Sequence, residues 1–432
     1  MNKKLVVLAV AGAFASPLAV QAQTANVTLY GRLNMDLEFV KGEQIDGSNP
    51  TVNRVSSNSS RFGMRGTESL GGGLNAIFQI ESNVSGDTGN SAASSLGSRE
   101  TFVGLQGSWG KATVGHFLMP QDDVRFIFDN KTTLGTSLLS DGALYAMAQE
   151  SKSNGGFDAR TGNNLRYDSP NYMGFTAALQ YSTRDSSGDT QNFISCTPAL
   201  ITNVCPALAP SGAVATGLDN GNHVSELRHA NVIGGNVIYN NGPISAAVSF
   251  ERNNKVRQYV QTTATGPLGT GCTATAPCFL FPNDTDWTIA GSYDFGTIMQ
   301  GFGLRVGLGY ERSKYITPTG DLKRDYWGVA LEVPLGGGKA MFNYGRASNG
   351  KGGAADTERI GISGALSHGS NTGAKLWEVS YVYSLSPRTL LQTGYIKIKN
   401  DDRATYTFHI NPYTIRTGAS PSALMFGIVH LF

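Results

Sequence analysis

The feature that most constrains this chain is a strict alternation of apolar and polar residues over long stretches. Between residues 26 and 40, every second residue is apolar or glycine: Val27, Leu29, Gly31, Leu33, Met35, Leu37 and Phe39. The residues between them are mostly polar: Thr28, Tyr30, Arg32, Asn34, Asp36 and Glu38. A period of two indicates a β-strand. The stretch is longer than an average globular strand of about 5–6 residues, and it suits a tilted strand that crosses a bilayer in about 9–11 residues.

The same alternation recurs to the end of the chain, for example over residues 175–181, 244–250, 304–310, 377–385 and 426–432. Aromatic residues stand at the ends of many of these stripes, and short Gly-, Asn- or Pro-containing turns alternate with long polar segments such as residues 41–59 and 84–98. Interfacial aromatics and turns that are short on one rim only are typical of outer-membrane barrels. We therefore expect an all-β fold, a sixteen-stranded antiparallel transmembrane β-barrel over residues 23–432, wide enough to leave an aqueous lumen.

The composition excludes several other classes of protein. Only 15% of the residues are charged, 54 of 432 are glycine, and the formal net charge is +2, whereas about 25% charged residues are usual. A disordered chain needs high charge and few aromatics, and a soluble helical protein needs a surface rich in Glu and Lys. Attraction of nucleic acid through bulk positive charge is not expected at this balance.

The first 22 residues are typical of a secretory signal peptide. Lys3 and Lys4 precede an apolar run over residues 5–20, and Val20 and Ala22 provide the small residues of a cleavage site. An N-terminal membrane anchor is the alternative, but the run is shorter than the roughly 20 residues that a spanning helix needs. We expect an exported protein whose mature chain starts near Gln23.

Two other interpretations remain open at this point. An exported β-sandwich or propeller would also alternate, although the strand length and the alternation of short and long connections favour a membrane barrel. An outer-membrane enzyme would need a nucleophile and a base, and Ser367-His368 is the only adjacent pair of this kind. We expect no enzyme, no cofactor and no metal site.

Several motifs resemble one known family. Residues 27–31 (VTLYG), 60–68 (SRFGMRGTE), 99–105 (RETFVGL) and 167–175 (YDSPNYMGF), together with the terminal Phe432, are similar in order and spacing to Gram-negative trimeric porins of the Neisseria and Bordetella type. The resemblance covers the whole mature chain. It implies a homotrimer in the cell outer membrane, surrounded by lipid that includes lipopolysaccharide, and a third extracellular loop folded into the lumen. The sequence itself shows that residues 117–163 form the longest connection, and long loops are usually functional.

The resemblance also points to the charged groups of a pore constriction. By motif position, Arg61, Arg99 and Arg160 would form its basic cluster, and Arg32 and Arg65 lie on strand faces that could reach the lumen. The opposing acids would come from the long loop, with these candidates: Asp122, Asp123, Asp129 and Asp141. Because arginine rings favour anions, we expect a general diffusion porin for ions and small hydrophilic solutes, with a modest anion preference.

A substrate-specific channel, for a sugar or an organic anion, is the main alternative function. Its signature would be an aromatic ladder along the lumen, for which Tyr30, Phe126, Phe128 and Tyr145 are available.

Four cysteines lie in two long segments: Cys196, Cys205, Cys272 and Cys278. An even number in an exported protein suggests disulfides. The short separations favour one pair within each segment, and a bridge between the segments stays open.

Overall fold

The computed structural model describes residues 26–89, 96–129, 134–146, 156–183, 193–195, 223–226, 230–257, 259–261, 265–270, 278–297, 303–360 and 366–432. The signal peptide expected over residues 1–22 lies outside these ranges, as do Cys196, Cys205 and Cys272. Cys278 begins a short strand, which ends at Leu280. Both the cleavage and the disulfides therefore stay predictions.

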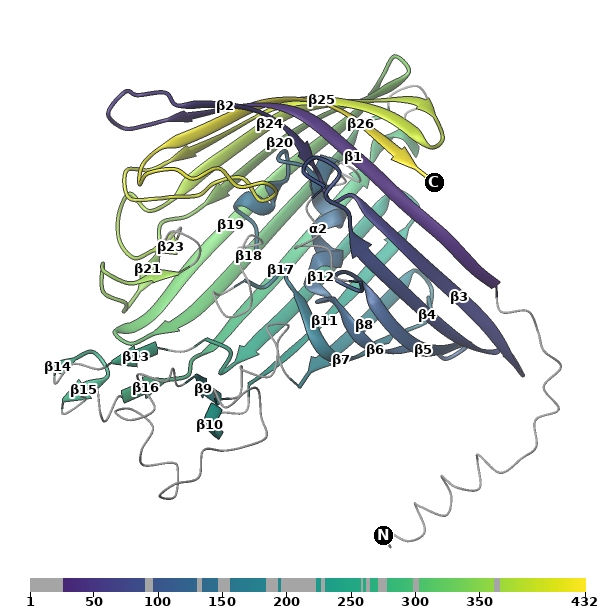
Figure 1. The fold of residues 1–432 in the computed structure, drawn as a ribbon, viewed down its shortest axis with the longest axis horizontal. Coiled ribbons are helices and arrows are strands. Elements are labelled where there is room, and N and C mark those ends of the chain that lie inside the picture. Colours follow the sequence, from purple (N-terminus) through teal and green to yellow (C-terminus); the bar gives the residue numbers. More distant parts are fainter. Residues whose placement is uncertain are drawn as a thin grey trace, which may run out of the picture.

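The described strands close into an antiparallel barrel with sixteen strand positions (Figure 1), which confirms the expected fold class. Strand β26 pairs with β1 from Leu431 opposite Arg32 to Ser420 opposite Glu43, and this ladder joins the two ends of the chain. In chain order the wall consists of β1 (Asn26–Glu43), β3 (Arg61–Gly71), β4 (Leu74–Asn83), β5 (Thr101–Gly107), β6 (Gly110–Leu118), β7 (Arg160–Asp168), β8 (Phe175–Ser182), β11 (Asn231–Asn241), β12 (Ile244–Asn254), β17 (Asn283–Asp294), β18 (Arg305–Thr317), β19 (Gly320–Leu335), β20 (Gly338–Ala347), β24 (Ala374–Ser386), β25 (Thr389–Asn400) and β26 (Ser420–Leu431).

Shorter strands extend or decorate this wall. Strand β2 (Thr51–Ser57) continues the place of β3 beside β1, and β21 (Lys351–Gly352) continues the place of β20 beside β19. The remaining pieces are β9 (Phe193–Ser195), β10 (His223–Glu226), β13 (Tyr259–Gln261), β14 (Thr265–Gly266), β15 (Gly269–Thr270), β16 (Cys278–Leu280), β22 (Arg359–Ile360), β23 (Leu366–Ser367) and the 3-10 turn η7 (Phe295–Thr297).

The two faces of the strands have opposite character, as the alternation predicted. In β1 the apolar parity points outward, where Leu29 is 63% exposed, while Asn34 and Glu38 on the other parity are fully buried inside the barrel. A soluble sheet would bury its apolar face instead. The apolar outside and polar inside are those of a barrel that faces hydrocarbon and encloses polar groups.

Connections at one end of the barrel are tight turns, and most of those at the other end are long. Two-residue turns join β5 to β6 and β11 to β12. The segment 41–59 is a correction to the sequence analysis: it was expected to be a long polar loop, but β1 runs to Glu43 and β2 begins at Thr51, leaving a short turn. Its β-branched residues Val52 and Val55 favour continuation of the ladder.

The connection between β6 and β7 folds into the barrel, as the resemblance implied. It contains helix α2 (Gln121–Asp129) and the 3-10 turns η2 (Leu134–Thr136) and η3 (Asp141–Ala143), and α2 contacts the inner face of β11, β12, β17, β18 and β19 (Figure 1). Among the described residues, no helix is long and apolar enough to cross a membrane.

The inward loop is held by apolar packing against the wall. Val124, Phe128, Leu134 and Tyr145 are at most 1% exposed. The Phe128 ring lies directly over Gly309, where a Cβ atom would come within 2.7 Å of it. Glycine at this wall position therefore lets the loop approach closely and occupy one side of the lumen.

Candidate functional site

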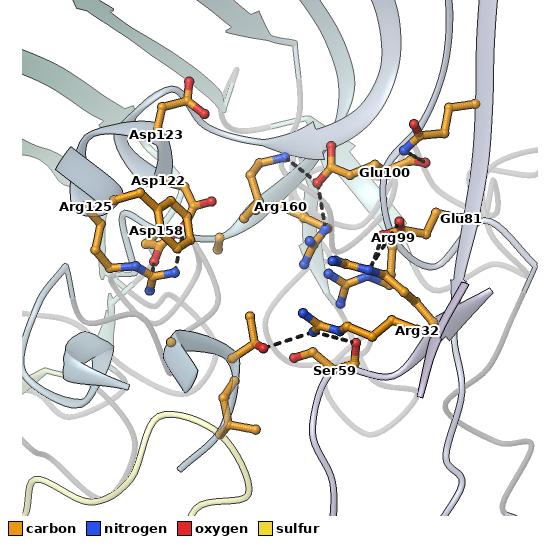
Figure 2. Close-up of a pocket in the computed structure, with 18 of the residues that line it drawn as sticks. Arg32, Ser59, Glu81, Arg99, Glu100, Asp122, Asp123, Arg125, Asp158 and Arg160 are labelled. Atoms are coloured by element: carbon orange, nitrogen blue, oxygen red, sulfur yellow. Dashed lines mark hydrogen bonds and ion pairs between the residues drawn. The ribbon is translucent and has the colours of Figure 1, made fainter. Parts of the chain in front are cut away.

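A cavity of about 730 Å³ lies in the lumen between the inward loop and the opposite wall (Figure 2). Seven arginines and five carboxylates line it: Arg32, Arg61, Arg65, Arg99, Arg125, Arg160 and Arg166, with Glu81, Glu100, Asp122, Asp123 and Asp158. The lining therefore carries an excess of positive charge in an otherwise nearly neutral chain.

Four of these arginines come from neighbouring positions of the early wall. Arg32 on β1 lies directly opposite Arg61 on β3, and Arg65 follows Arg61 on the same face of β3. Arg99 lies two residues before the first residue of β5. Because like charges directly opposite one another are destabilising, this wall needs compensating acceptors or anions.

Part of the compensation comes from Glu81 on β4. One of its carboxylate oxygens accepts from Arg99 Nε at 2.7 Å, and the other accepts from the Tyr30 hydroxyl at 3.1 Å and lies 3.7 Å from Arg61 Nε. Arg65 stacks over the Tyr30 ring at 5.2 Å, a cation–π contact. One carboxylate thus serves two arginines and leaves the group positive.

Arg32 reaches from the wall to the loop. Its Nη2 donates to the Ser59 carbonyl oxygen and to Thr136 Oγ1 on η2, both at 3.0 Å. Both acceptors are neutral oxygens, so these hydrogen bonds do not offset the positive charge that Arg32 contributes to the cavity.

Two further arginines lie on β7. Arg160 Nε pairs with Glu100 at 3.1 Å, and Arg166 Nη2 pairs with Asp123 of α2 and with Asp168, both at 2.8 Å. Burial raises the pKa of the Asp123 carboxyl, although the Arg166 charge works against that shift.

The loop contributes a compact acidic group around one arginine. Arg125 forms ion pairs with Asp122 at 3.1 Å and with Asp158 at 3.0 Å, and its guanidinium stacks on Phe126 at 4.9 Å. Burial lowers the pKa of Arg125, but Asp158, Asp122 and the other nearby carboxylates outweigh it, so this pKa lies above its usual value. Figure 2 shows this group across the cavity from Arg32, Arg99 and Arg160.

All five arginines predicted from the sequence, Arg32, Arg61, Arg65, Arg99 and Arg160, line the cavity. Of the predicted loop acids, Asp122 and Asp123 also line it. Asp129 and Asp141 do not, and this corrects the sequence analysis: each is only 2% exposed. Asp129 is the last residue of α2, which ends at the wall on the far side of the lumen from the arginine cluster; there Arg305 donates to the Ile127 carbonyl oxygen at 2.6 Å. The Asp141 carboxylate accepts a hydrogen bond from the Tyr326 hydroxyl.

Five charged residues of the cavity were not among the predicted site residues: Glu81, Glu100, Arg125, Asp158 and Arg166. For two of them, the sequence contains a pattern from which the position could have been predicted. Glu81 shares the polar face of its strand with Gln79, and Arg125 lies three residues after Asp122, a spacing that places both on one helix face.

The aromatic ladder that would mark a substrate-specific channel is incomplete. Tyr30 and Phe126 line the cavity, whereas Phe128 and Tyr145 are buried where the loop packs on the wall. The Ser367-His368 pair forms no nucleophile–base arrangement, because the His368 ring contacts Asp356 Oδ1 at 2.8 Å and the Gly352 carbonyl oxygen at 3.2 Å.

Comparison with known proteins places this geometry in context. The model of the Gram-negative porin family matches residues 6–403. The chain is 26% identical to outer membrane porin protein 32 of Delftia acidovorans over the full length of both, and 28% identical to an outer membrane porin protein of Bordetella pertussis over 90% of this chain and 92% of that one. An anion-selective porin from Comamonas acidovorans shares the fold, with a TM-score of 0.65 and 23% identity over 94% of this chain and all of that one.

Proposed function

The chain belongs to the Gram-negative porin family, and we propose that its arginine-lined cavity makes it a general diffusion pore with a preference for small hydrophilic anions. Its location is the cell outer membrane, since its relatives are outer-membrane porins and its fold is a transmembrane barrel. Porins are channels and not a family of enzymes.

One observation carries the ion preference: seven arginines and five carboxylates line the cavity. Low-dielectric walls around a narrow aqueous passage focus the field of such fixed charges, and arginine rings favour anions. Arg32 and Arg61, opposite one another in register, give the early wall its greatest density of positive charge.

The charges are also separated in space. The early wall carries most of the arginines, while Asp122 and Asp158 lie on the loop across the cavity (Figure 2). A solute between them experiences a transverse field, which orients polar solutes and admits cations along the loop side. The predicted preference is therefore modest.

A channel specific for organic anions is the second candidate. The guanidinium fork matches a carboxylate in two-point contact, and Arg61 and Arg160 keep 29% and 23% of their side chains exposed. The interrupted aromatic set, with Phe128 and Tyr145 away from the cavity, counts against a sugar-specific pathway.

The assembly and processing of the chain complete the proposal. A homotrimer is the assembly that family membership supports, and cleavage after residue 22 would produce the mature chain. N-terminal sequencing of the protein from outer membranes checks the cleavage, with Gln23 as the expected first residue.

Planar-bilayer recording of the purified protein tests the pore function. We expect conductance steps in groups of three, rising linearly with KCl concentration, without saturable block by any single sugar. Saturable block by one dicarboxylate would favour the specific channel, and the absence of steps would contradict a pore.

A further inference from the structure

A second segment of the chain reaches the cavity besides the connection between β6 and β7. It is the connection between β25 and β26, residues 401–419, and two of its residues, His409 and Ile410, line the cavity. Figure 1 shows this yellow segment beside the inward loop, which His409 contacts at Ser140. Among the described residues that line the cavity, His409 is the only histidine.

Hydrogen bonds at the base of this segment hold it in place. At the end of β25, Asn400 Nδ2 donates to the carbonyl oxygens of Tyr406 and Ala419, at 2.8 Å and 2.7 Å, and so ties the two arms of the segment together. Residues 404–408, which lead directly to His409, are all buried. His409 therefore has a defined position at the edge of the cavity.

His409 lies on the loop side of the cavity. Its Nδ1 atom is 3.0 Å from Ser140 Oγ, the oxygen that caps η3 by accepting from the Gly142 amide. A Cβ atom at Gly142 would lie 2.5 Å from His409 Nδ1 and 3.0 Å from Arg125 Nη1. The imidazole and the Arg125 guanidinium thus flank the same glycine, across the cavity from the arginines of the early wall (Figure 2).

The charges on this side of the cavity are mostly negative. On the elements packed against His409, three carboxylates surround one arginine: Arg125 and Asp122 on α2, Asp141 on η3, and Asp158 before β7. Across the cavity stands Arg32 of the early wall. The charged residues on and next to the segment of His409 form ion pairs of their own: Arg403 with Asp356, Arg416 with Asp46, and Arg54 with Glu38. A proton on His409 therefore brings positive charge to the side of the cavity where negative charge prevails.

We propose that His409 is a specificity-determining residue of the pore, whose imidazolium form offsets the loop carboxylates and hinders the passage of cations along them. The inference rests on the proposed pore function and deepens it, because it assigns the control of cation passage to one side chain. The anion preference of the pore should accordingly strengthen in mildly acidic surroundings.

The expected size of the effect follows from one charge in a narrow aqueous passage. A histidine side chain ordinarily changes its charge between pH 5 and 8. At pH 8 the neutral imidazole leaves Asp122 and Asp158 to attract K⁺, and at pH 5 the imidazolium offsets part of this attraction. Low-dielectric walls strengthen such fields. Through His409 alone, the Cl⁻/K⁺ permeability ratio should rise by roughly twofold to threefold from pH 8 to pH 5.

The test measures zero-current potentials in a KCl gradient at pH 8, 6.5 and 5 for the wild type, H409Q and H409K. H409Q should lose this twofold to threefold part of the rise, while the part that comes from Asp123 remains in both proteins. H409K carries the positive charge throughout, so its ratio at pH 8 should already exceed that of the wild type by the same factor. H430Q is the matched control, because His430 on β26 is exposed outside the lumen, and it should keep the wild-type profile.

An H409Q profile as steep as that of the wild type would overturn the proposal, as would a wild-type ratio in H409K at pH 8. If H409Q forms no pores, the H409K ratio alone decides. A role of His409 confined to its contact with Ser140 would not give H409K a raised ratio. Absence of conductance steps in the wild type would contradict the pore function, whereas steps with an unchanged pH profile in both variants would contradict this inference alone.

Discussion

Arg166 on the barrel wall and Asp123 on the inward helix form an ion pair with a length of 2.8 Å between Nη2 and Oδ2. Asn236 on β11 donates to the same carboxylate oxygen at 3.0 Å. Two wall strands thus hold α2 by one carboxylate that lines the lumen. The charge state of this carboxylate affects both the position of the loop and the field in the cavity.

The first prediction concerns pH. Burial raises the pKa of Asp123, so this carboxyl binds a proton at a higher pH than an ordinary aspartate, which titrates near pH 3.9. Proton binding removes a negative charge from the cavity, and the Cl⁻/K⁺ permeability ratio should therefore rise as the pH falls from neutral toward acid. Reversal potentials at a series of pH values measure this change. D123N should have a higher ratio at neutral pH and a flatter profile, and an equally steep profile in D123N would contradict the assignment.

The second prediction concerns the early wall. In R61Q/R99Q the carboxylate of Glu81 loses both arginine partners and contributes negative charge to the cavity. Two charges removed within a narrow throat should lower the Cl⁻/K⁺ permeability ratio by roughly threefold to tenfold. R388Q, at an exposed turn residue that does not line the cavity, serves as the control. Similar permeability ratios in R61Q/R99Q and R388Q would show that this wall does not set the ion preference.

The third prediction concerns the seat of the inward helix. A Cβ atom at Gly307 would lie 1.9 Å from the Phe128 carbonyl oxygen, so G307A should displace α2 into the lumen and lower the single-channel conductance. G291A is the matched control, because its Cβ atom would meet only the Ser245 carbonyl oxygen at 3.7 Å. Wild-type conductance in G307A would contradict this role of the glycine.

The fourth prediction concerns stability. Arg324 Nη2 pairs with Glu311 Oε1 at 2.7 Å and both side chains are fully buried, while Glu311 Oε2 accepts from the Ala146 amide at 2.8 Å. E311A leaves a buried guanidinium without this carboxylate and should cost about 3–5 kcal/mol. E332A breaks a pair with the exposed Lys339 and should cost at most about 1 kcal/mol. Thermal unfolding in detergent measures both, and equal midpoints would refute the difference.

The sequence allowed the barrel and one side of the cavity to be predicted, because both depend on local pattern. Parity alone placed Arg32 on the inner face of β1, and the motifs around Arg61, Arg99 and Arg160 placed those residues near it. The long loop was harder to predict, since the orientation of its acids depends on how it packs.

Asp129 shows the reason. Its helix ends where Phe128 lies over Gly309 of the far wall, and this contact, between residues distant in the sequence, turns Asp129 away from the cavity. Likewise, nothing in the sequence near Glu81 shows that Arg99, Arg61 and Tyr30 converge on it.

The most direct test of the account is the zero-current potential of the wild-type pore in a tenfold KCl gradient at neutral pH. Seven arginines against five carboxylates at the cavity predict a potential whose sign shows that Cl⁻ crosses more readily than K⁺. A potential of zero, or one with the sign of K⁺ preference, would contradict the claim that the arginine cluster governs permeation.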